Sequence, residues 1–425
     1  MCLFWTKISN TTVKYFFTAF LISISSFFLQ AQKTDKALNS ILKKNKKLST
    51  VLSNPIEYRV QVLYTTIKNG KPGKTLAYNL NDKNYFYPAS TIKLPAVLLA
   101  LEKLNKIGPS NGIDLNTPMR VESNLENYPS VFYDSTAHNF YPSIGNYCKK
   151  ILLVSDNDAF NRLYDFVGPK ALNQTMHEKG YKNFRAAHRL SISLSPEVNR
   201  SKPEVTFGTI KQIPSTPDFA KTDRMEVSTA EHIYHEPASI KEAPEPKPGK
   251  PIFIGKGYMN DDKLINKPMD FSSKNVFTLK EQHEVIMSLF FPNDVAASKR
   301  FNLSKEQESF VKKYMSMLPR ESDFPKYEES RFYDSYVTYF MYGDQKTRIP
   351  DNIRIYNKVG GAYGFLIDNA YITDSNSGVE FILSAVVYCN KDGILNDDKY
   401  DYNEIGYPFL AELGRTIFDY ELRKK

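Results

Sequence analysis

The pattern of apolar and polar positions predicts strands at both ends of the chain and helices between them. Apolar residues alternate from Tyr58 to Tyr64, which predicts a strand. Asn69-Gly70 predicts a hairpin turn, with a returning strand at 75–80. Three more strands are predicted late in the sequence, at 353–360, 364–372 and 379–389. Because early and late strands must meet in one sheet, we expect an α/β (α+β) fold. Its mixed, mainly antiparallel five-stranded sheet would be covered by helices, with a helical subdomain.

The segment 90–104 is apolar nearly all round, which predicts a buried helix. Pro95 lies within it, and proline is tolerated only near the first turn of a helix, so we expect the helix to begin close to Ser90. Apolar residues at helical spacing predict further helices at 35–52, 144–153, 159–166, 169–179, 279–290, 305–317 and 407–422.

The composition changes between Ser201 and Pro251, where 8 of the 24 prolines fall within 51 residues. This density of proline predicts little helix or strand, so we expect an irregular insertion with few core contacts. His232, His235 and Glu236 lie inside it and are residue types that bind metals. Imidazoles need a rigid scaffold to converge on an ion, however, so we expect no metal there.

The first residues, 1–31, are predicted to be a signal peptide, and 32–425 a single domain carrying the insertion. Lys7 and Lys14 precede an apolar run at 15–29, and a cleavage point follows Ala31. Fifteen residues are short for a membrane span, which needs roughly 20, although an uncleaved anchor is the alternative. We therefore expect an exported protein, periplasmic or secreted, without a stable transmembrane anchor after cleavage.

Composition narrows the partners and cofactors. The chain has 425 residues, of which 41% are hydrophobic and 13% aromatic, as is typical of globular proteins. Its net charge of +9 is spread along the sequence and not clustered. Such a charge favours binding to an anionic surface but does not indicate a nucleic-acid-binding site. Beyond the signal, Cys148 and Cys389 can form at most one disulfide and no metal cluster. We expect a monomer without metal or cofactor.

Candidate chemistry begins with Ser90-Thr91-Ile92-Lys93 at the start of the buried helix. Residues at i and i+3 lie about 5–6 Å apart on one helix face. A partly desolvated lysine loses its proton more easily and can activate the serine, while the helix N-terminus offers N–H groups to a developing oxyanion. Ser40…Lys43 and Ser309…Lys312 have the same spacing, but neither opens a buried helix. The sequence contains no Gly-x-Ser-x-Gly, no His-Glu-x-x-His and no phosphate loop.

Two further motifs follow. Ser155-Asp156-Asn157 lies between two predicted helices, where a hydroxyl and an amide could relay a proton and orient a substrate amide. The alternative is a simple helix N-cap. Lys358-Val359-Gly360-Gly361 lies in a late strand, where glycines allow a substrate backbone to approach closely.

In this order, the three motifs resemble those of the penicillin-recognising serine hydrolases. The resemblance is specifically to the class A β-lactamase branch, with its Ser-x-x-Lys, Ser-Asp-Asn and Lys-Thr-Gly elements. It covers most of residues 35–420. Many family members pair a cysteine at the position of Cys148 with one at the position of Val97, so the resemblance implies that this disulfide is missing here.

The resemblance implies a role for each motif residue. Ser90 would be the acylated nucleophile, Lys93 its activating neighbour, and Ser155 the group that carries a proton to the departing nitrogen. The substrate-binding residues would be Asn157, Lys358, Gly360 and Gly361. Asn157 would hold Lys93 and the substrate amide, and Lys358 would polarise Ser155 and attract the substrate carboxylate. The backbone N–H groups of Ser90 and Gly361 would form the oxyanion hole.

The chain departs from the family pattern at two places. Val359 replaces a threonine or serine, which removes a hydroxyl for the substrate carboxylate. The family's deacylating glutamate belongs to a Glu-x-x-Leu-Asn stretch, and in LSISLSPEVNR we expect Ser195 in its place. Glu197 is the nearby carboxylate, either a shifted deacylating base or an ordinary loop acid. Without a positioned base, acylation proceeds while hydrolysis of the acyl-enzyme slows.

Three functions are compatible with these residues. A β-lactam hydrolase comes first, because the motifs are closest to that branch. The second is a D-alanyl-peptide hydrolase or acyltransferase acting on peptidoglycan peptides. The third, an inactive wall-binding module, is disfavoured by the complete set of candidate catalytic residues.

Overall fold

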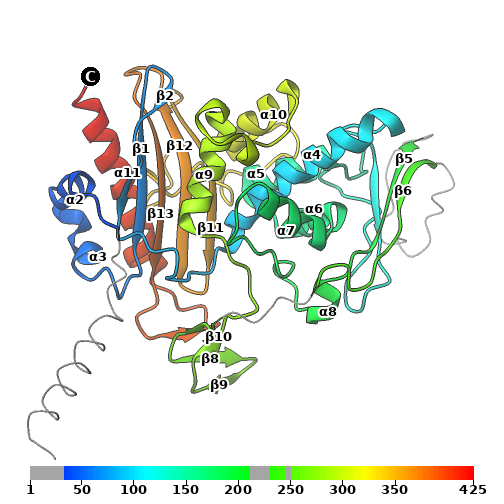
Figure 1. Cartoon of the computed structure of the whole chain (residues 1–425), viewed down its shortest axis with the longest axis horizontal. Coiled ribbons are helices and arrows are strands. Elements are labelled where there is room, and N and C mark those ends of the chain that lie inside the picture. Colours follow the sequence, from blue (N-terminus) through cyan, green and yellow to red (C-terminus); the bar gives the residue numbers. More distant parts are fainter. Residues whose placement is uncertain (1–32, 211–229, 245–249) are drawn as a thin grey trace, which may run out of the picture. The chain divides into compact units, whose positions relative to one another are not determined.

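The main sheet of the computed structural model joins early and late strands of the chain, and all its pairs are antiparallel (Figure 1). The structure describes residues 33–210, 230–244 and 250–425. The strand order is β11-β12-β13-β1-β2, and β3 also pairs with β1. These strands are β1 (Gln61–Lys68), β2 (Lys71–Pro72), β3 (Leu76–Tyr78), β11 (Ile353–Ala362), β12 (Phe365–Asp374) and β13 (Glu380–Tyr388). The predicted α+β fold is confirmed.

The predicted hairpin turn connects β1 to β2. Asn69 and Gly70 have φ values of 53° and 70°, both in the left-handed region that a tight two-residue turn requires. Lys68 therefore lies opposite Lys71.

Helices cover both faces of the sheet (Figure 1). Helices α11 (Tyr407–Leu422) and α2 (Lys36–Lys43) lie on one face, and α9 (Leu279–Phe290) lies on the other. Because helices cover both faces, most residues of β12 and β13 are buried, and the two strands are mostly apolar.

The single helix predicted at 35–52 is wrong, because the chain breaks at Asn45. Three short pieces replace it: α2, η1 (Lys46–Leu48) and α3 (Ser49–Ser53). The Asn45 side chain accepts a hydrogen bond from the Lys47 N–H and donates to Glu412 and Thr416 of α11. These contacts with a distant helix are invisible in the local apolar pattern.

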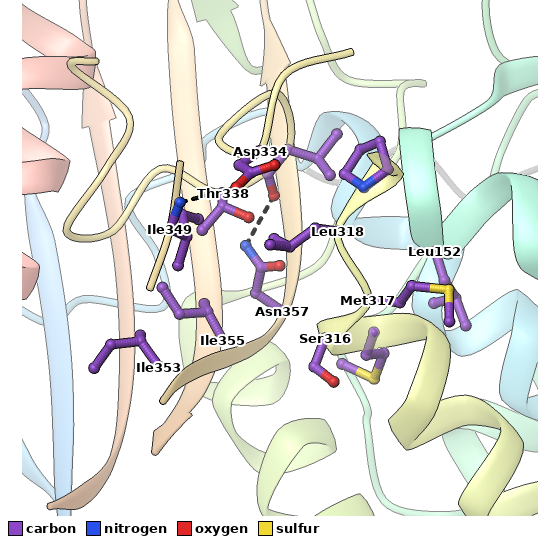
Figure 2. A pocket seen from close by; sticks show the side chains of 13 residues that line it. Leu152, Ser316, Met317, Leu318, Asp334, Thr338, Ile349, Ile353, Ile355 and Asn357 are labelled. Carbon is purple, nitrogen blue, oxygen red and sulfur yellow. Dashed lines mark hydrogen bonds between the residues drawn. The ribbon is translucent and has the colours of Figure 1, made fainter. Parts of the chain in front are cut away.

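Buried polar side chains anchor β11 to the loop before it (Figure 2). The Asn357 amide donates to the Val337 carbonyl at 3.0 Å and to one Asp368 oxygen at 2.9 Å. The other Asp368 oxygen accepts from the backbone N–H groups of Tyr339 and Phe340, each at 3.0 Å. The cavity beside Asn357 holds about 10 Å³, which has room for no more than one water. This cavity therefore belongs to the packing of β11 and not to a ligand site.

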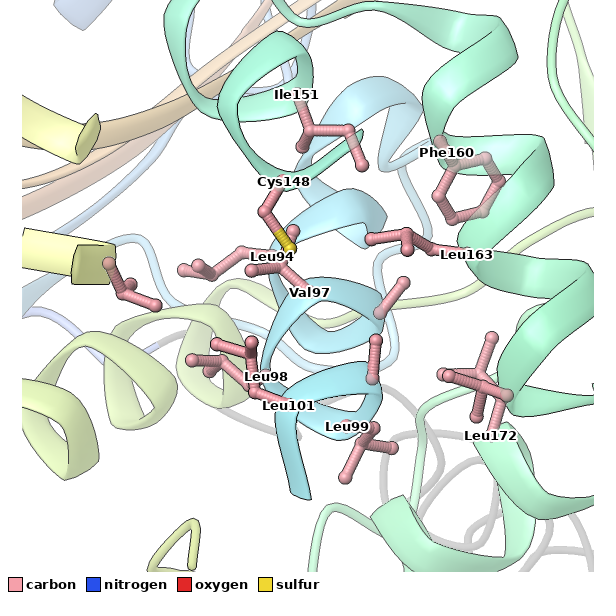
Figure 3. Close-up of a cluster of buried hydrophobic side chains, with 14 of the residues drawn as sticks. Leu94, Val97, Leu98, Leu99, Leu101, Cys148, Ile151, Phe160, Leu163 and Leu172 are labelled. Carbon is pink, nitrogen blue, oxygen red and sulfur yellow. The ribbon is translucent and has the colours of Figure 1, made fainter. Parts of the chain in front are cut away.

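Helix α4 (Lys93–Asn111) runs through the core of the helical region (Figure 3). The 3₁₀ turn η2 (Ala89–Ile92) precedes it, so helical backbone starts beside Ser90 as predicted, and Pro95 falls in the first turn. Val97 lies beside Cys148, whose thiol is free and buried. The surrounding helices are α5 (Ile144–Val154), α6 (Asn157–Val167), α7 (Pro169–Glu178) and α10 (Lys305–Ser316).

The irregular insertion predicted for 201–251 is wrong where the structure describes it. Strands β5 (Glu204–Ile210) and β6 (Ala230–Glu236) form an antiparallel pair, and β5 also pairs with β4 (Met119–Glu122). Val205 and Phe207 are fully buried in the same core as α4. Pro203 and Pro237 flank the strands rather than interrupt them, which explains why proline density was misleading. Residues 245–249, in the most proline-rich part, lie outside the described residues.

The candidate metal ligands in this insertion have other partners. The Glu236 carboxylate binds Lys103 and Lys202, and His235 faces Glu204 at 3.4 Å. The His232 side chain lies outside the description. Among the described residues, no three His, Cys, Asp or Glu side chains gather closely enough to hold a metal ion.

Short strands form two small sheets in the second half of the chain. One contains β7 and β10, and the other contains β8, β9 and β14, whose β8–β14 pair is parallel. Their bounds are β7 (Phe253–Ile254), β8 (Gly257–Asn260), β9 (Lys263–Ile265), β10 (Met269–Asp270) and β14 (Ile394–Leu395). The remaining helical turns are α8 (Pro196–Asn199), η4 (Pro292–Asp294), η5 (Ala297–Lys299), η6 (Pro319–Glu321) and η7 (Tyr402–Gly406).

Phe207→Ala tests whether the β5–β6 hairpin packs on the core. The Phe207 ring lies edge-on to Phe166 at 5.5 Å and is fully buried. Removing it leaves a cavity, so we expect the free energy of unfolding to fall by about 3–5 kcal/mol in denaturant titration. Phe253→Ala is the matched control, since Phe253 is 57% exposed and its loss should change stability by less than about 1 kcal/mol. Equal, small losses in both variants would contradict the packing.

The predicted signal peptide, 1–31, lies outside the described residues. Within the part that the structure describes, no helix has the length and apolar character to cross a membrane.

Candidate active site

Ser90 lies in η2, pressed against strand β11. A Cβ atom at Gly360 would stand 2.7 Å from the Pro88 carbonyl oxygen, so only glycine allows η2 and β11 to approach this closely. The close approach that Gly360 permits in this structure is to the chain's own η2. Ala89 has a φ of 48°, an uncommon conformation for alanine that fixes the direction of Ser90.

Lys93 points into the junction between α5 and α6. Its side chain is fully buried, and its Nζ donates to the Ser155 carbonyl and to Asn157 Oδ1, both at 2.5 Å. Burial, with the positive charge of Lys358 in addition, holds the Lys93 pKa well below its usual value. A neutral amine has two N–H groups, and these two acceptors use both. The lowered pKa favours this neutral form, whose lone pair can accept a proton.

The hydroxyl of Ser90 is half-buried and has no hydrogen-bond partner within the described part of the chain. It faces a cavity of about 420 Å³ that Asn157 and Gly361 also line. Ser90 is therefore accessible to a small molecule in that cavity.

Ser155 connects the two candidate lysines. It ends α5 with a φ of 59°, and its Oγ accepts from Lys358 Nζ at 2.7 Å. Lys93 Nζ is 3.4 Å from the same oxygen. The capping role considered for this motif falls to Asp156, which accepts from the Ala159 N–H. Ser155 and Asn157 therefore remain available for chemistry.

Lys358 is nearly as buried as Lys93. Burial lowers its pKa to about 7, while the buried carboxylate of Asp368 acts in the opposite direction. Its Nζ also donates to the Val359 carbonyl at 3.1 Å. The Val359 side chain is buried in the core between the sheet and α11. Near neutral pH, this ammonium is thus partly charged beside Ser155.

Ser191 is a site residue that the sequence analysis missed. Its Oγ accepts from Asn157 Nδ2 at 2.6 Å, and it lines the same cavity as Ser90. No signal for this role existed in the sequence, because the contact joins Ser191 to a residue 34 positions earlier in the chain. Ser195, the residue expected at the glutamate position, does not line this cavity, and its hydroxyl caps α8 by accepting from the Val198 N–H at 3.2 Å.

Glu197 is not brought to the site. Its carboxylate is 53% exposed and pairs with Lys241 at 3.1 Å. It does not line the cavity that contains Ser90. Among the described residues that line this cavity, Asp398 at the rim is the one carboxylate. The position beside Asn157 therefore has a hydroxyl where a general base would be needed.

A sequence model described as the beta-lactamase enzyme family matches residues 43–231. The matched region contains Ser90, Lys93, Ser155 and Asn157, the residues that the structure brings together with Lys358. This part of the chain, less than half of its length, is similar to the beta-lactamase enzyme family. No curated protein matches the sequence.

Several solved structures are similar to this chain. A β-lactamase from Desulfarculus baarsii is 14% identical, with a TM-score of 0.47, and the match covers 88% of this chain and 95% of that one. A structure of PBP-A is 12% identical, with a TM-score of 0.49 and coverages of 91% and 97%. The chromosome-encoded β-lactamase of Vibrio parahaemolyticus is 16% identical, with a TM-score of 0.46 and coverages of 89% and 98%.

Proposed function

We propose that this β-lactamase-like protein is a serine hydrolase that opens β-lactam amides through an acyl-enzyme on Ser90 and releases the product slowly. One observation carries the proposal: a fully buried Lys93 whose two amine N–H groups are used by carbonyl acceptors beside an unpartnered Ser90 hydroxyl. A lysine in this state serves as a general base for its neighbouring serine.

The acylation step follows from these contacts. The Ser90 proton passes to Lys93 Nζ as Oγ attacks the lactam carbonyl, and the N–H groups of Ser90 and Gly361 stabilise the oxyanion. When the C–N bond breaks, Ser155 gives its proton to the leaving nitrogen and regains one from Lys93, 3.4 Å away. Lys358 donates a hydrogen bond to the Ser155 oxygen and so favours its transient loss of a proton.

Deacylation needs a base that activates water. Ser191 occupies the position beside Asn157, and a serine hydroxyl does not accept a proton from water near neutral pH. The acyl-enzyme should therefore accumulate, as it does in a penicillin-binding protein.

The serine beside Asn157, in place of a carboxylate, also favours a second candidate: a D-alanyl-peptide hydrolase or acyltransferase on peptidoglycan peptides. An enzyme that transfers its acyl group to an amine has no need of a water-activating carboxylate in this position. The inactive wall-binding module is disfavoured, because Lys93 and Lys358 both contact Ser155 and the Ser90 hydroxyl lines the same cavity as Asn157.

A mass-spectrometric time course tests the proposal. Incubation with benzylpenicillin should add the mass of the intact drug to the protein within minutes, and the adduct should persist for many turnovers of an efficient β-lactamase. No adduct combined with no hydrolysis would refute the proposal. Release of a D-alanyl dipeptide's terminal residue at a faster rate than β-lactam hydrolysis would favour the second candidate.

We further propose that the protein acts outside the cytoplasm as a monomer. The support is the basic and apolar character of residues 1–31, which resembles a signal peptide. N-terminal sequencing of the protein recovered from a periplasmic fraction tests this, and an N-terminus at Gln32 is the expected result.

We expect the charge state of Lys358 to set how the rate of acylation changes with pH. With a pKa of about 7, its ammonium loses charge as pH rises, and its attraction for a substrate carboxylate is lost with it. We expect the second-order rate constant of acylation to fall as pH rises through about 7. Lys358→Arg stays charged, so in this variant the fall should disappear. An unchanged fall in Lys358→Arg would assign the titration to another group.

A further inference from the structure

A second cavity of about 460 Å³ adjoins the one that contains Ser90. Tyr87, Leu190, Ser191 and Tyr363 line both cavities, so the two form one continuous cleft. Ser191 is the residue that binds the Asn157 amide. The second cavity therefore opens on the side of the cleft where the substrate's acyl amide is expected.

Tyr87 and Tyr363 form one wall of this cleft, and the ring of Phe271, which is fully buried, packs against both of them. Tyr363 lies edge-on to Tyr87 at 5.0 Å and to Phe271 at 5.1 Å, and Tyr87 meets Phe271 at 6.1 Å. Tyr363 is in the β11–β12 turn, whereas Phe271 follows β10 of the small sheet. Edge-to-face contacts of this kind fix ring orientation. The wall is therefore a rigid platform.

Lys274 extends over this platform and lines the second cavity. Its Nζ is 5.3 Å from the ring centre of Tyr363 and 5.8 Å from that of Phe271. Its backbone carbonyl accepts from the Arg185 guanidinium at 2.7 and 2.9 Å, which fixes where the side chain starts. In the described part of the chain, Lys274 forms no ion pair. Asp270 is the acid whose pKa its charge helps to lower, and the Asp270 carboxylate accepts a hydrogen bond from the Ser272 N–H.

The second cavity is positive in character. None of the residues that line it is acidic, and Arg200 lines it together with Lys274. His188, stacked on Tyr87, has its pKa lowered to about 4 by burial, and the positive charges of Lys274 and Arg185 act in the same direction. His188 is thus neutral, and the positive charge comes from the lysine and arginine side chains.

We propose that Lys274 binds a carboxylate on the acyl side of the substrate, so that the enzyme prefers substrates with two negative charges. One charge would meet Lys358 and the other Lys274. A penicillin with a carboxylated side chain has this chemistry, and so does a wall peptide with a free carboxylate before its D-alanyl end. This inference rests on the proposed acyl-enzyme at Ser90.

Lys274→Met is the decisive variant, because methionine keeps much of the volume and removes the charge. Acylation rates are measured with α-carboxybenzylpenicillin and benzylpenicillin, which differ by one carboxylate. We expect the acylation rate of Lys274→Met to fall about ten-fold with the carboxylated drug and to be unchanged with benzylpenicillin, because methionine offers no charged hydrogen-bond donor to the second carboxylate. Lys274→Arg should keep the preference. Lys263→Met, an exposed lysine on β9, is the matched control and should behave as the wild type.

Each outcome separates the two proposals. If the wild type forms no adduct with benzylpenicillin, the proposed function fails before the inference is tested. If it forms the adduct but Lys274→Met treats both drugs as the wild type does, the inference is overturned. A matched pair of D-alanyl peptides, with the preceding carboxylate free or amidated, shows whether the same preference holds for wall substrates. If the free carboxylate speeds acylation by the peptides but not by the penicillins, the proposed role of Lys274 is overturned for β-lactams.

Discussion

Ser90→Ala should abolish the covalent penicillin adduct, because the alanine has no oxygen to acylate. Every other part of the proton path, from Lys93 to Ser155 and Lys358, remains in place in this variant. Loss of a catalytic nucleophile typically costs a factor of 10³ or more even when the surrounding site is intact. Mass spectrometry after incubation with benzylpenicillin is the direct measurement, and the expected mass is that of the unmodified protein.

Ser40→Ala and Ser309→Ala are matched controls for this experiment. Both serines stand three residues before a lysine, as Ser90 does, but they lie exposed on α2 and α10. These variants should acylate at the wild-type rate. An adduct that persists in Ser90→Ala and vanishes in either control would mean that spacing alone misidentified the nucleophile.

The main sheet could be predicted because its signal spans consecutive residues. Strands β12 and β13 are buried on both faces, so they are mostly apolar, broken by Asp368, Asn369 and Ser384 within their buried stretches. The β5–β6 hairpin had a shorter signal, the alternation of Val205 and Phe207, and the surrounding prolines obscured it. Burial against α4, which makes this hairpin part of the core, depends on residues far away in sequence.

The candidate catalytic residues also fall into two groups: those related by local spacing, which the sequence predicts, and those related by long-range contacts, which it does not. Ser90 and Lys93 share one turn, so their relation is local and can be read from spacing. The role of Ser191 comes from its contact with Asn157, 34 residues earlier in the chain. Glu197 was chosen for its residue type, whereas its position gives it an ordinary surface ion pair with Lys241. Lys274 has no sequence signal, because the rings beneath it come from separate segments.

Ser191→Glu should convert slow release into turnover. The new carboxylate would extend from the position beside Asn157 into the cavity that holds Ser90, where it can take a proton from the attacking water. A positioned general base contributes about 10²–10⁴-fold, so we expect the deacylation rate constant to rise by about this factor while acylation changes little. A pre-steady-state time course with a chromogenic cephalosporin measures both steps. The wild type should show a burst followed by slow turnover, and the variant should lose the burst.

Two controls separate position from residue type. Glu197→Gln should match the wild type, because the Glu197 carboxylate is at the surface and paired with Lys241. Ser195→Glu adds the same carboxylate four residues away, where the side chain caps α8 and does not line the cavity, so it should not accelerate release. Ser191 has a φ of 54°, a conformation that aspartate tolerates better than most residues, and Ser191→Asp therefore covers the case in which the glutamate variant folds poorly.

If wild-type turnover is rapid without a burst, or if Glu197→Gln alone prolongs the adduct, the deacylating base lies elsewhere than beside Asn157. If Ser191→Glu and Ser191→Asp both fold and neither shortens the adduct, water does not reach the acyl carbonyl from this side of the cleft.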